Sequence, residues 1–189
     1  IAAAKDEMVA IYRDLHANPE LGFEETRTSK IVAEKLAEYG VDEVHTGLGK
    51  TGVVAVIHGK SAGNRRIGLR ADMDALPIDE ISGVPFASKT SGKMHACGHD
   101  GHTTMLLGAA RHLSQTRDFD GTAVLIFQPA EEGLGGARQM IADGLFETFP
   151  VDEIYGMHNS PNGRPGTFDI CKGVAMAGAM FFDAHIRGV

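Results

Sequence analysis

The segment 94–102, MHACGHDGH, holds three histidines and a cysteine within nine residues. Cys97 and His99 are two positions apart, so on an extended segment their side chains project the same way and can reach one metal ion. A thiolate together with an imidazole favours a borderline metal such as zinc over magnesium or calcium. The alternative is a helix N-terminus rich in small residues, where His99 and His102 only cap the helix. The spacing favours the metal.

Two adjacent carboxylates, Glu131 and Glu132, follow the apolar run 122–127. Removing both from water is costly unless a positive group lies beside them. Because neighbouring side chains point in different directions, one can bind a metal while the other takes a proton from a water whose pKa the metal lowers to about 7. The alternative is an acidic first turn of a helix over 135–142, where glutamate stabilises the helix dipole. The residues alone leave both interpretations open.

Two further polar clusters adjoin strand-like runs. His158 directly follows such a run, and although a lone histidine is more often structural, its place at a strand end favours a ligand. Asp72 and Asp74 alternate on one face of an extended segment and can orient ligating histidines. Ordinary turn chemistry before Pro77 is the alternative for the two aspartates.

A nucleophilic cysteine is the competing chemistry for Cys97. It requires a base within hydrogen-bond reach and a third group that orients the base. The side chains of Cys97 and His99 would run parallel instead of facing each other, so metal ligation is the stronger interpretation. The chain contains no glycine-rich phosphate loop.

Composition excludes several partners. The net charge is −7, acidic residues are scattered, and lysine and arginine form no cluster, so neither a nucleic acid nor an anionic membrane surface is expected as a partner. No apolar run approaches the roughly 18–20 residues that span a bilayer. Two cysteines in 189 residues make no disulfide framework, and a thiolate among histidines indicates a reducing compartment. We therefore expect a cytoplasmic protein with one core.

Hydrophobic periodicity predicts the elements that position these clusters. Helices are predicted over 2–16, 24–39, 101–114 and 135–142, and strands over 52–58, 66–71, 122–127 and 153–157. The loop 59–64 suits a hairpin between the first two strands. The alternation of strands and helices predicts an α/β fold, with a mostly parallel central sheet and helices on both faces. In such sheets functional residues collect beyond the carboxyl ends of the strands, where these clusters fall.

Five segments, in order, resemble the amidohydrolase branch of the dinuclear zinc-peptidase superfamily. They are LHANPELGFEE, RADMDALPI, MHACGHDGHT, FQPAEEGLGGA and YGMHN. The branch includes hippurate hydrolase, indoleacetyl-amino-acid hydrolases and N-acyl-amino-acid amidohydrolases, and the resemblance runs from about residue 11 to the end of the chain. It implies a zinc-peptidase-like catalytic domain.

The resemblance also implies roles for individual residues. The implied ligands of two divalent ions (zinc, manganese, cobalt or nickel) are Cys97, His99, Glu132 and His158. Glu131 is the implied general base and proton shuttle. Asp74 takes the place of an aspartate that orients a metal-binding histidine in related peptidases. Asp72 stands where the wider superfamily usually has a ligating histidine, which is a departure from the pattern.

Family members carry an inserted lid domain that mediates dimerisation, and a further histidine ligand near the C-terminus. The alternating segment 179–189 resembles the first strand of that lid, so His185 within it is not the missing ligand. We therefore expect residues 1–178 to form an incomplete catalytic domain and 179–189 the start of a truncated lid. The chain is then a fragment, and the complete enzyme is expected to be a homo-oligomer.

The implied activity is metal-dependent hydrolysis of the amide bond of N-acyl amino acids, of the hippurate or N-acetyl type. An aminopeptidase or dipeptidase of the same superfamily is the alternative, but the cysteine of the ACGHD motif favours the acyl-amino-acid branch. A non-catalytic metal-binding remnant is the other alternative. The presence of Glu131 argues against it, because a structural metal site has no use for a base.

Overall fold

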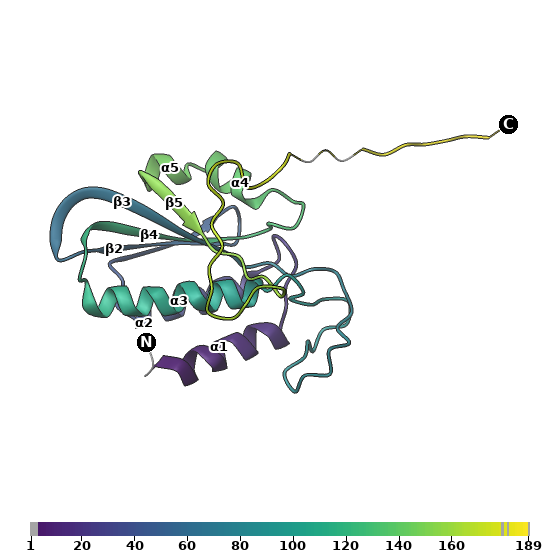
Figure 1. Ribbon diagram of the computed structural model, residues 1–189, viewed down its shortest axis with the longest axis horizontal. Coiled ribbons are helices and arrows are strands. Elements are labelled where there is room, and N and C mark those ends of the chain that lie inside the picture. The colour runs from purple at the N-terminus through teal and green to yellow at the C-terminus, as the bar shows by residue number, and fades with distance from the viewer. Residues whose placement is uncertain (1–3, 179, 181, 189) are drawn as a thin grey trace. The chain divides into compact units, whose positions relative to one another are not determined.

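The computed structural model describes residues 4–178, 180 and 182–188. The chain divides into a compact unit that ends at Asn159 and a second segment that begins at Ser160. The compact unit contains every helix and strand of the described residues (Figure 1). These are α1 (Lys5–Ala17), α2 (Thr26–Glu38), β1 (Glu43–Leu48), β2 (Gly52–His58), β3 (Ser61–Asp72), α3 (His99–Thr116), β4 (Asp120–Gln128), α4 (Gly136–Ala142), α5 (Leu145–Thr148) and β5 (Glu153–Gly156).

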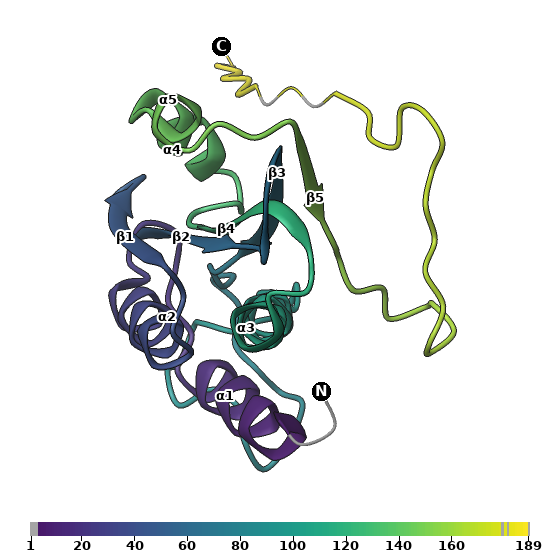
Figure 2. The same ribbon diagram turned by 90° about the vertical axis from the view of Figure 1, so that its left-hand side faces the viewer.

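One five-stranded sheet, in the order β1-β2-β4-β3-β5, forms the centre of this unit (Figure 2). Strand β3 pairs in parallel with both β4 and β5, whereas β2 is antiparallel to both β1 and β4. The predicted α/β class is confirmed, and the parallel part of this mixed sheet is β4-β3-β5. Asp72 is level with Gln128, so β3 and β4 end together, and β5 ends close by. Polar residues that follow these three strands therefore gather at one edge.

The predicted hairpin between β2 and β3 is wrong, because β4 lies between the two strands and pairs with both. Strand β4 is buried from Gly121 onward, so it is best accommodated in the middle of the sheet, where both of its faces are covered. Strand β1 was not predicted. Its sequence EVHTGL is largely polar and half-exposed, which is typical of an edge strand and gives little periodic signal.

Helices cover both faces of the sheet, as predicted. In β2, Val53, Ala55 and Ile57 face a core shared with α1, α2 and α3. The alternate residues Val54 and Val56 face a second core with α4 and α5 (Figure 2). This period of two follows from the pleat of the strand. None of the helices within the described residues is long and apolar enough to cross a membrane.

From Ser160 to Gly188, the described residues are exposed and form no helix or strand. The strand expected within 179–189 is therefore not formed by residues 180 and 182–188, while 179, 181 and 189 lie outside the described residues. A strand needs a neighbour to pair with, and no described residue of this segment takes part in the sheet. The boundary at 178/179 stays a prediction.

Candidate metal centre

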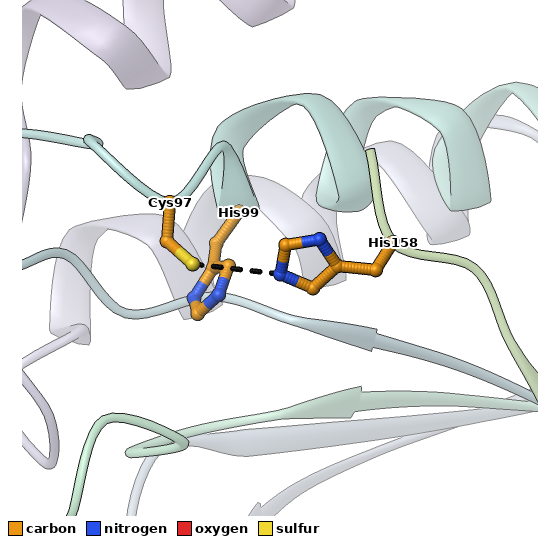
Figure 3. Close-up of side chains that lie close together, drawn as sticks. All are labelled: Cys97, His99 and His158. Atoms are coloured by element: carbon orange, nitrogen blue, oxygen red, sulfur yellow. Dashed lines mark hydrogen bonds between the residues drawn. The ribbon is translucent and has the colours of Figure 1, made fainter. Parts of the chain in front are cut away.

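The predicted polar clusters meet at the edge where the parallel strands end. Cys97, His99 and His158 point toward one another, and one donor atom of each lies within 4.8 Å of the others (Figure 3). The Sγ atom of Cys97 is 3.4 Å from Nε2 of His158. Two more groups meet the same criterion, and both include His99: one adds Asp72 and His102, and the other adds Glu131 and Glu132. His99 is thus the common member of the whole site.

Cys97 and His99 meet through a turn, so the expected extended segment is wrong. Helix α3 begins at His99, and Gly98 before it has φ 88°, in the left-handed region that favours glycine. A Cβ atom on Gly98 would lie 2.6 Å from the side chain of Asn159. No side chain among the described residues caps this helix, so His99 and His102 are not capping residues. Glycine at position 98 therefore permits both the turn and the close approach of the loop after β5.

Two buried polar atoms of the site lack a hydrogen-bond partner among the described residues. They are Nε2 of His99 and Oε1 of Glu132, and they lie 3.9 Å apart. Burial of unpaired polar atoms is costly and uncommon in folded proteins. Ligands of a tetrahedral zinc ion, each about 2.1 Å from the metal, lie about 3.4 Å apart. The two orphaned atoms therefore fit a bound metal ion, with Nδ1 of His99 directed to Asp74 at 3.3 Å.

Negative charge is concentrated around His99. Burial alone would lower the pKa of His99, but the hydrogen bond to Asp74 and the charges of Asp72, Asp74 and Glu132 outweigh it and raise the pKa. The site accordingly favours a positive charge at its centre. A divalent cation supplies that charge and leaves the imidazole neutral for ligation.

The thiol of Cys97 is a poor nucleophile in this setting. Burial, followed by the hydrogen bond and charge of Glu132, raises the pKa of Cys97 to about 11. His158 is close enough to act as a base, which the spacing of the sequence did not suggest. Even so, a thiol with this pKa stays protonated at neutral pH. Coordination to a metal reverses this, because a ligating thiol is deprotonated, so the geometry favours Cys97 as a ligand.

Glu131 and Glu132 lie in a loop, which excludes the alternative of an acidic first helical turn. Helix α4 begins only at Gly136 and has no acidic residue in its first turn. Glu131 is exposed, whereas Glu132 is half-buried and its backbone N–H donates to Oδ2 of Asp74 at 2.9 Å. The two aspartates do not serve a turn before Pro77, because Asp72 is the last residue of β3 and the carboxylate of Asp74 contacts both His99 and the backbone of this loop.

The sequence left Asp72 and His102 without a settled role. Nδ1 of His102 is 2.6 Å from Oδ1 of Asp72, and Arg70 donates to Oδ2 of the same carboxylate at 2.8 Å. Burial opposes ionisation of Asp72, but His102 and Arg70 together with His99 lower its pKa to about 2. The backbone N–H of Asn159 donates to Nε2 of His102 at 3.0 Å. His102 thus ties the residue after His158 to the end of β3. The i, i+3 spacing from His99 was the signal for this role.

Buried nitrogen and oxygen donors at the carboxyl ends of parallel strands, with a half-buried thiol beside them, make this an α/β domain that can hold metal ions. The chain belongs to peptidase family M20/M25/M40, whose model matches residues 68–184. The family resemblance inferred from the sequence is thereby confirmed.

Comparison with individual proteins agrees with this assignment. The chain is 51% identical to hippurate hydrolase of Campylobacter jejuni over 182 residues. This alignment covers 96% of this chain and 47% of that protein. The chain is 47% identical over 188 residues to thermostable carboxypeptidase 2 of Saccharolobus solfataricus, with 97% and 47% covered. The crystal structure of the Bacillus subtilis YXEP protein, a dinuclear metal-binding peptidase from the M20 family, matches with a TM-score of 0.80 and 44% identity, over 86% of this chain and 45% of that one. The chain spans about half the length of the curated relatives it matches.

Proposed function

We propose that the protein hydrolyses the amide bond of N-acyl amino acids by a metal-activated water. The observation that carries the proposal is the pair of orphaned buried atoms, Nε2 of His99 and Oε1 of Glu132, which face each other beside an exposed glutamate. The likeness to a hippurate hydrolase supports an acyl amino acid as the substrate, because hippurate is itself an N-acyl amino acid.

Four side chains would hold two divalent ions, which we propose to be zinc, manganese, cobalt or nickel. These ligands are Cys97, His99, Glu132 and His158. Their sulfur, nitrogen and oxygen atoms suit a borderline metal. When bound, such ions acidify a water molecule and polarise the substrate carbonyl. The likeness to a dinuclear metal-binding peptidase supports the pair.

Glu131 is the proposed general base. Its carboxylate lies within 4.8 Å of the donor atoms of His99 and Glu132, and it is exposed, so it can exchange protons with a substrate. It takes a proton from the attacking water and passes that proton to the departing amine. Asp74 holds Nδ1 of His99, which directs Nε2 into the site, and also accepts the N–H of Glu132. Asp74 therefore positions two proposed ligands at once.

We further propose a small-molecule substrate, no nucleic-acid or membrane partner, a homo-oligomeric complete enzyme and a cytoplasmic location, where a reducing medium keeps Cys97 free. A carboxypeptidase is the second candidate function, because thermostable carboxypeptidase 2, at 47% identity, is nearly as similar to the chain as the hippurate hydrolase, at 51%. A lid boundary near residue 178 belongs to the same proposal.

The direct test is hydrolysis by the metal-loaded full-length protein. We would measure kcat/KM for hippurate, N-acetyl amino acids, indoleacetyl amino acids, dipeptides and longer peptides. The proposal predicts that the acyl amino acids are the best substrates and that a chelator abolishes turnover. A clear preference for peptides of three or more residues would favour the carboxypeptidase, and chelator-resistant hydrolysis would refute the metal mechanism.

A further inference from the structure

Glu25, immediately before α2, is a fully buried carboxylate with both oxygens engaged. Its Oε2 atom accepts a hydrogen bond from the Thr51 hydroxyl at 2.6 Å, and its Oε1 atom accepts one from the backbone N–H of Ala130 at 2.8 Å. Burial raises the pKa of Glu25, and these hydrogen bonds only partly oppose that shift. No lysine or arginine of the described residues forms an ion pair with Glu25. A buried acid without a cation is costly, so its location calls for an explanation.

The partner of Glu25 has an unusual backbone. Ala130 has φ 50°, in the left-handed region that residues with a Cβ atom rarely adopt. Such a conformation persists only where its surroundings enforce it. The backbone N–H of Ala130 donates to Glu25, and the backbone carbonyl of Ala130 accepts a hydrogen bond from the N–H of Gly136 at 2.9 Å. A Cβ atom on Gly22 would lie 3.0 Å from Cα of Ala130, so the segment before α2 packs directly on this turn.

The strained turn leads straight into the proposed metal centre. Ala130 precedes Glu131, and the next residue, Glu132, donates its N–H to Oδ2 of Asp74. Two buried carboxylates therefore fix the backbone of this short loop, with Glu25 holding its start and Asp74 holding its end. The direction in which both glutamates leave β4 depends on the φ angle of Ala130.

We propose that Glu25 is a positioning residue whose carboxylate holds Ala130 in the left-handed conformation, so that Glu131 and Glu132 reach the metal centre. The inference rests on the proposed function for the roles of the two glutamates. An apolar side chain at position 25 would fill the same space without the cost of burying an acid, but it would leave the N–H of Ala130 unpaired. The hydrogen bond, rather than packing, is therefore the reason for an acid at this position.

The test compares Glu25→Ala with Glu25→Gln in the metal-loaded full-length protein. Glu25→Ala should lower kcat by about 10²-fold with little change in KM, because a misplacement of about 1 Å at the reacting groups has effects of this size. Glu25→Gln keeps an acceptor for the Ala130 N–H and offers an N–H donor to Thr51. It should restore most of the lost kcat.

The neighbouring glutamate provides a matched control. Glu24 carries the same charge one position away, but its side chain is 61% exposed and pairs with Lys93 at the surface. Glu24→Ala should leave kcat, KM and metal binding unchanged.

A second readout does not depend on turnover. With cobalt(II) in the site, the visible absorption spectrum reports on the ligands, so Glu25→Ala should alter the spectrum and weaken cobalt binding as Glu132 moves away. Glu25→Gln should resemble wild type. If the wild-type protein hydrolysed no acyl amino acid, the proposed function would fail, but the cobalt comparison would still decide the role of Glu25.

Two results would overturn the inference. One is a Glu25→Ala protein with wild-type kcat and cobalt spectrum, and the other is a Glu25→Gln protein as impaired as Glu25→Ala. If Glu25→Ala does not fold, Thr51→Val decides the matter, because it keeps the shape and removes the hydroxyl that orients Glu25. It should change the spectrum and kcat in the same direction by a smaller factor, and wild-type values would contradict the inference.

Discussion

The core beneath α1–α3 and the cluster of Asp72, Asp74, His99 and His102 at the end of β3 are both buried, but they use burial in opposite ways. Leu107 and Leu125 are fully buried among apolar neighbours and need no specific partner. His99 is equally buried, yet it is surrounded by carboxylates, and its Nε2 atom has no hydrogen-bond partner in the described part of the chain. The first region gains stability from removing surface from water. In the second region, the burial of polar atoms lowers stability but holds those atoms in fixed positions.

This contrast shows where function lies in the molecule. Apolar burial identifies the scaffold, whereas buried polar atoms without partners identify the place where another group is needed. If this is correct, substitutions in the two regions should separate stability from activity.

The largest expected effect is on activity at the edge. Glu131→Gln should cut turnover by at least about 10²-fold, the usual scale for the loss of a general base, and should leave metal binding and the unfolding midpoint unchanged. Steady-state kinetics and metal content on one preparation measure both. Near-normal turnover in this variant would remove Glu131 from the mechanism.

In the core, the opposite pattern is expected. Leu125→Ala should lower the free energy of unfolding by about 3 kcal/mol, because it leaves a cavity where a fully buried side chain was. The activity per folded, metal-loaded molecule should remain close to wild type. Urea unfolding followed by circular dichroism gives the first quantity, and active-site titration gives the second. A selective loss of activity would show that scaffold and site are not separable.

A smaller effect on stability is expected from His16, which links α1 to the start of α3 through its hydrogen bond to Asp100. Burial alone would lower the pKa of His16, but hydrogen bonds to Asp100 (2.6 Å) and Glu80 (3.1 Å), with their charges, raise it. The stabilisation is therefore complete below the ordinary histidine pKa of about 6.5 and is lost as pH rises through the higher folded value. His16→Gln should lower stability by about 2 kcal/mol at pH 5.5. Its effect should shrink at pH 9, and a larger effect at pH 9 would contradict this sign.

The smallest expected effect is a change in stability that differs between the metal-free and the metal-loaded protein. Glu132→Gln removes one of several crowded negative charges, so the metal-free protein should become more stable by about 1 kcal/mol, a common gain when a functional site is relaxed. The metal-loaded variant should lack the stabilisation that metal gives to wild type. Thermal unfolding with and without chelator measures both, and a variant less stable in the metal-free form would count against charge repulsion at the site.

Local pattern predicted most elements of the fold but not their pairing. Each helix and strand predicted before residue 158 corresponds to an observed one, because periods of 3.6 and 2 are local properties. The strand expected within 179–189 is the exception, since the described residues of that segment form none. The insertion of β4 between β2 and β3 depends on contacts between residues far apart in the chain, and nothing in the loop 59–64 indicates it. The polar edge strand β1 carries too weak a pattern to be found.

The residue types of the site could be predicted from the sequence, but the contacts between those residues could be predicted only in part. Residues that follow parallel strands must meet at one edge, which is why Glu131, Glu132 and His158 could be grouped from the sequence. The turn at Gly98 and the bond between Glu25 and Ala130 depend on backbone angles and on long-range contact. Such features become visible only in three dimensions.

The measurement that tests the central claim most directly is a calorimetric titration of zinc and of manganese into chelator-stripped full-length protein, comparing wild type with Cys97→Ser. If Cys97 binds the metal beside His99 and His158, the variant should bind at least about 10-fold more weakly, the minimum expected when a ligand is lost. Equal affinity in the two proteins would show that Cys97 is no ligand and would contradict the proposed metal centre.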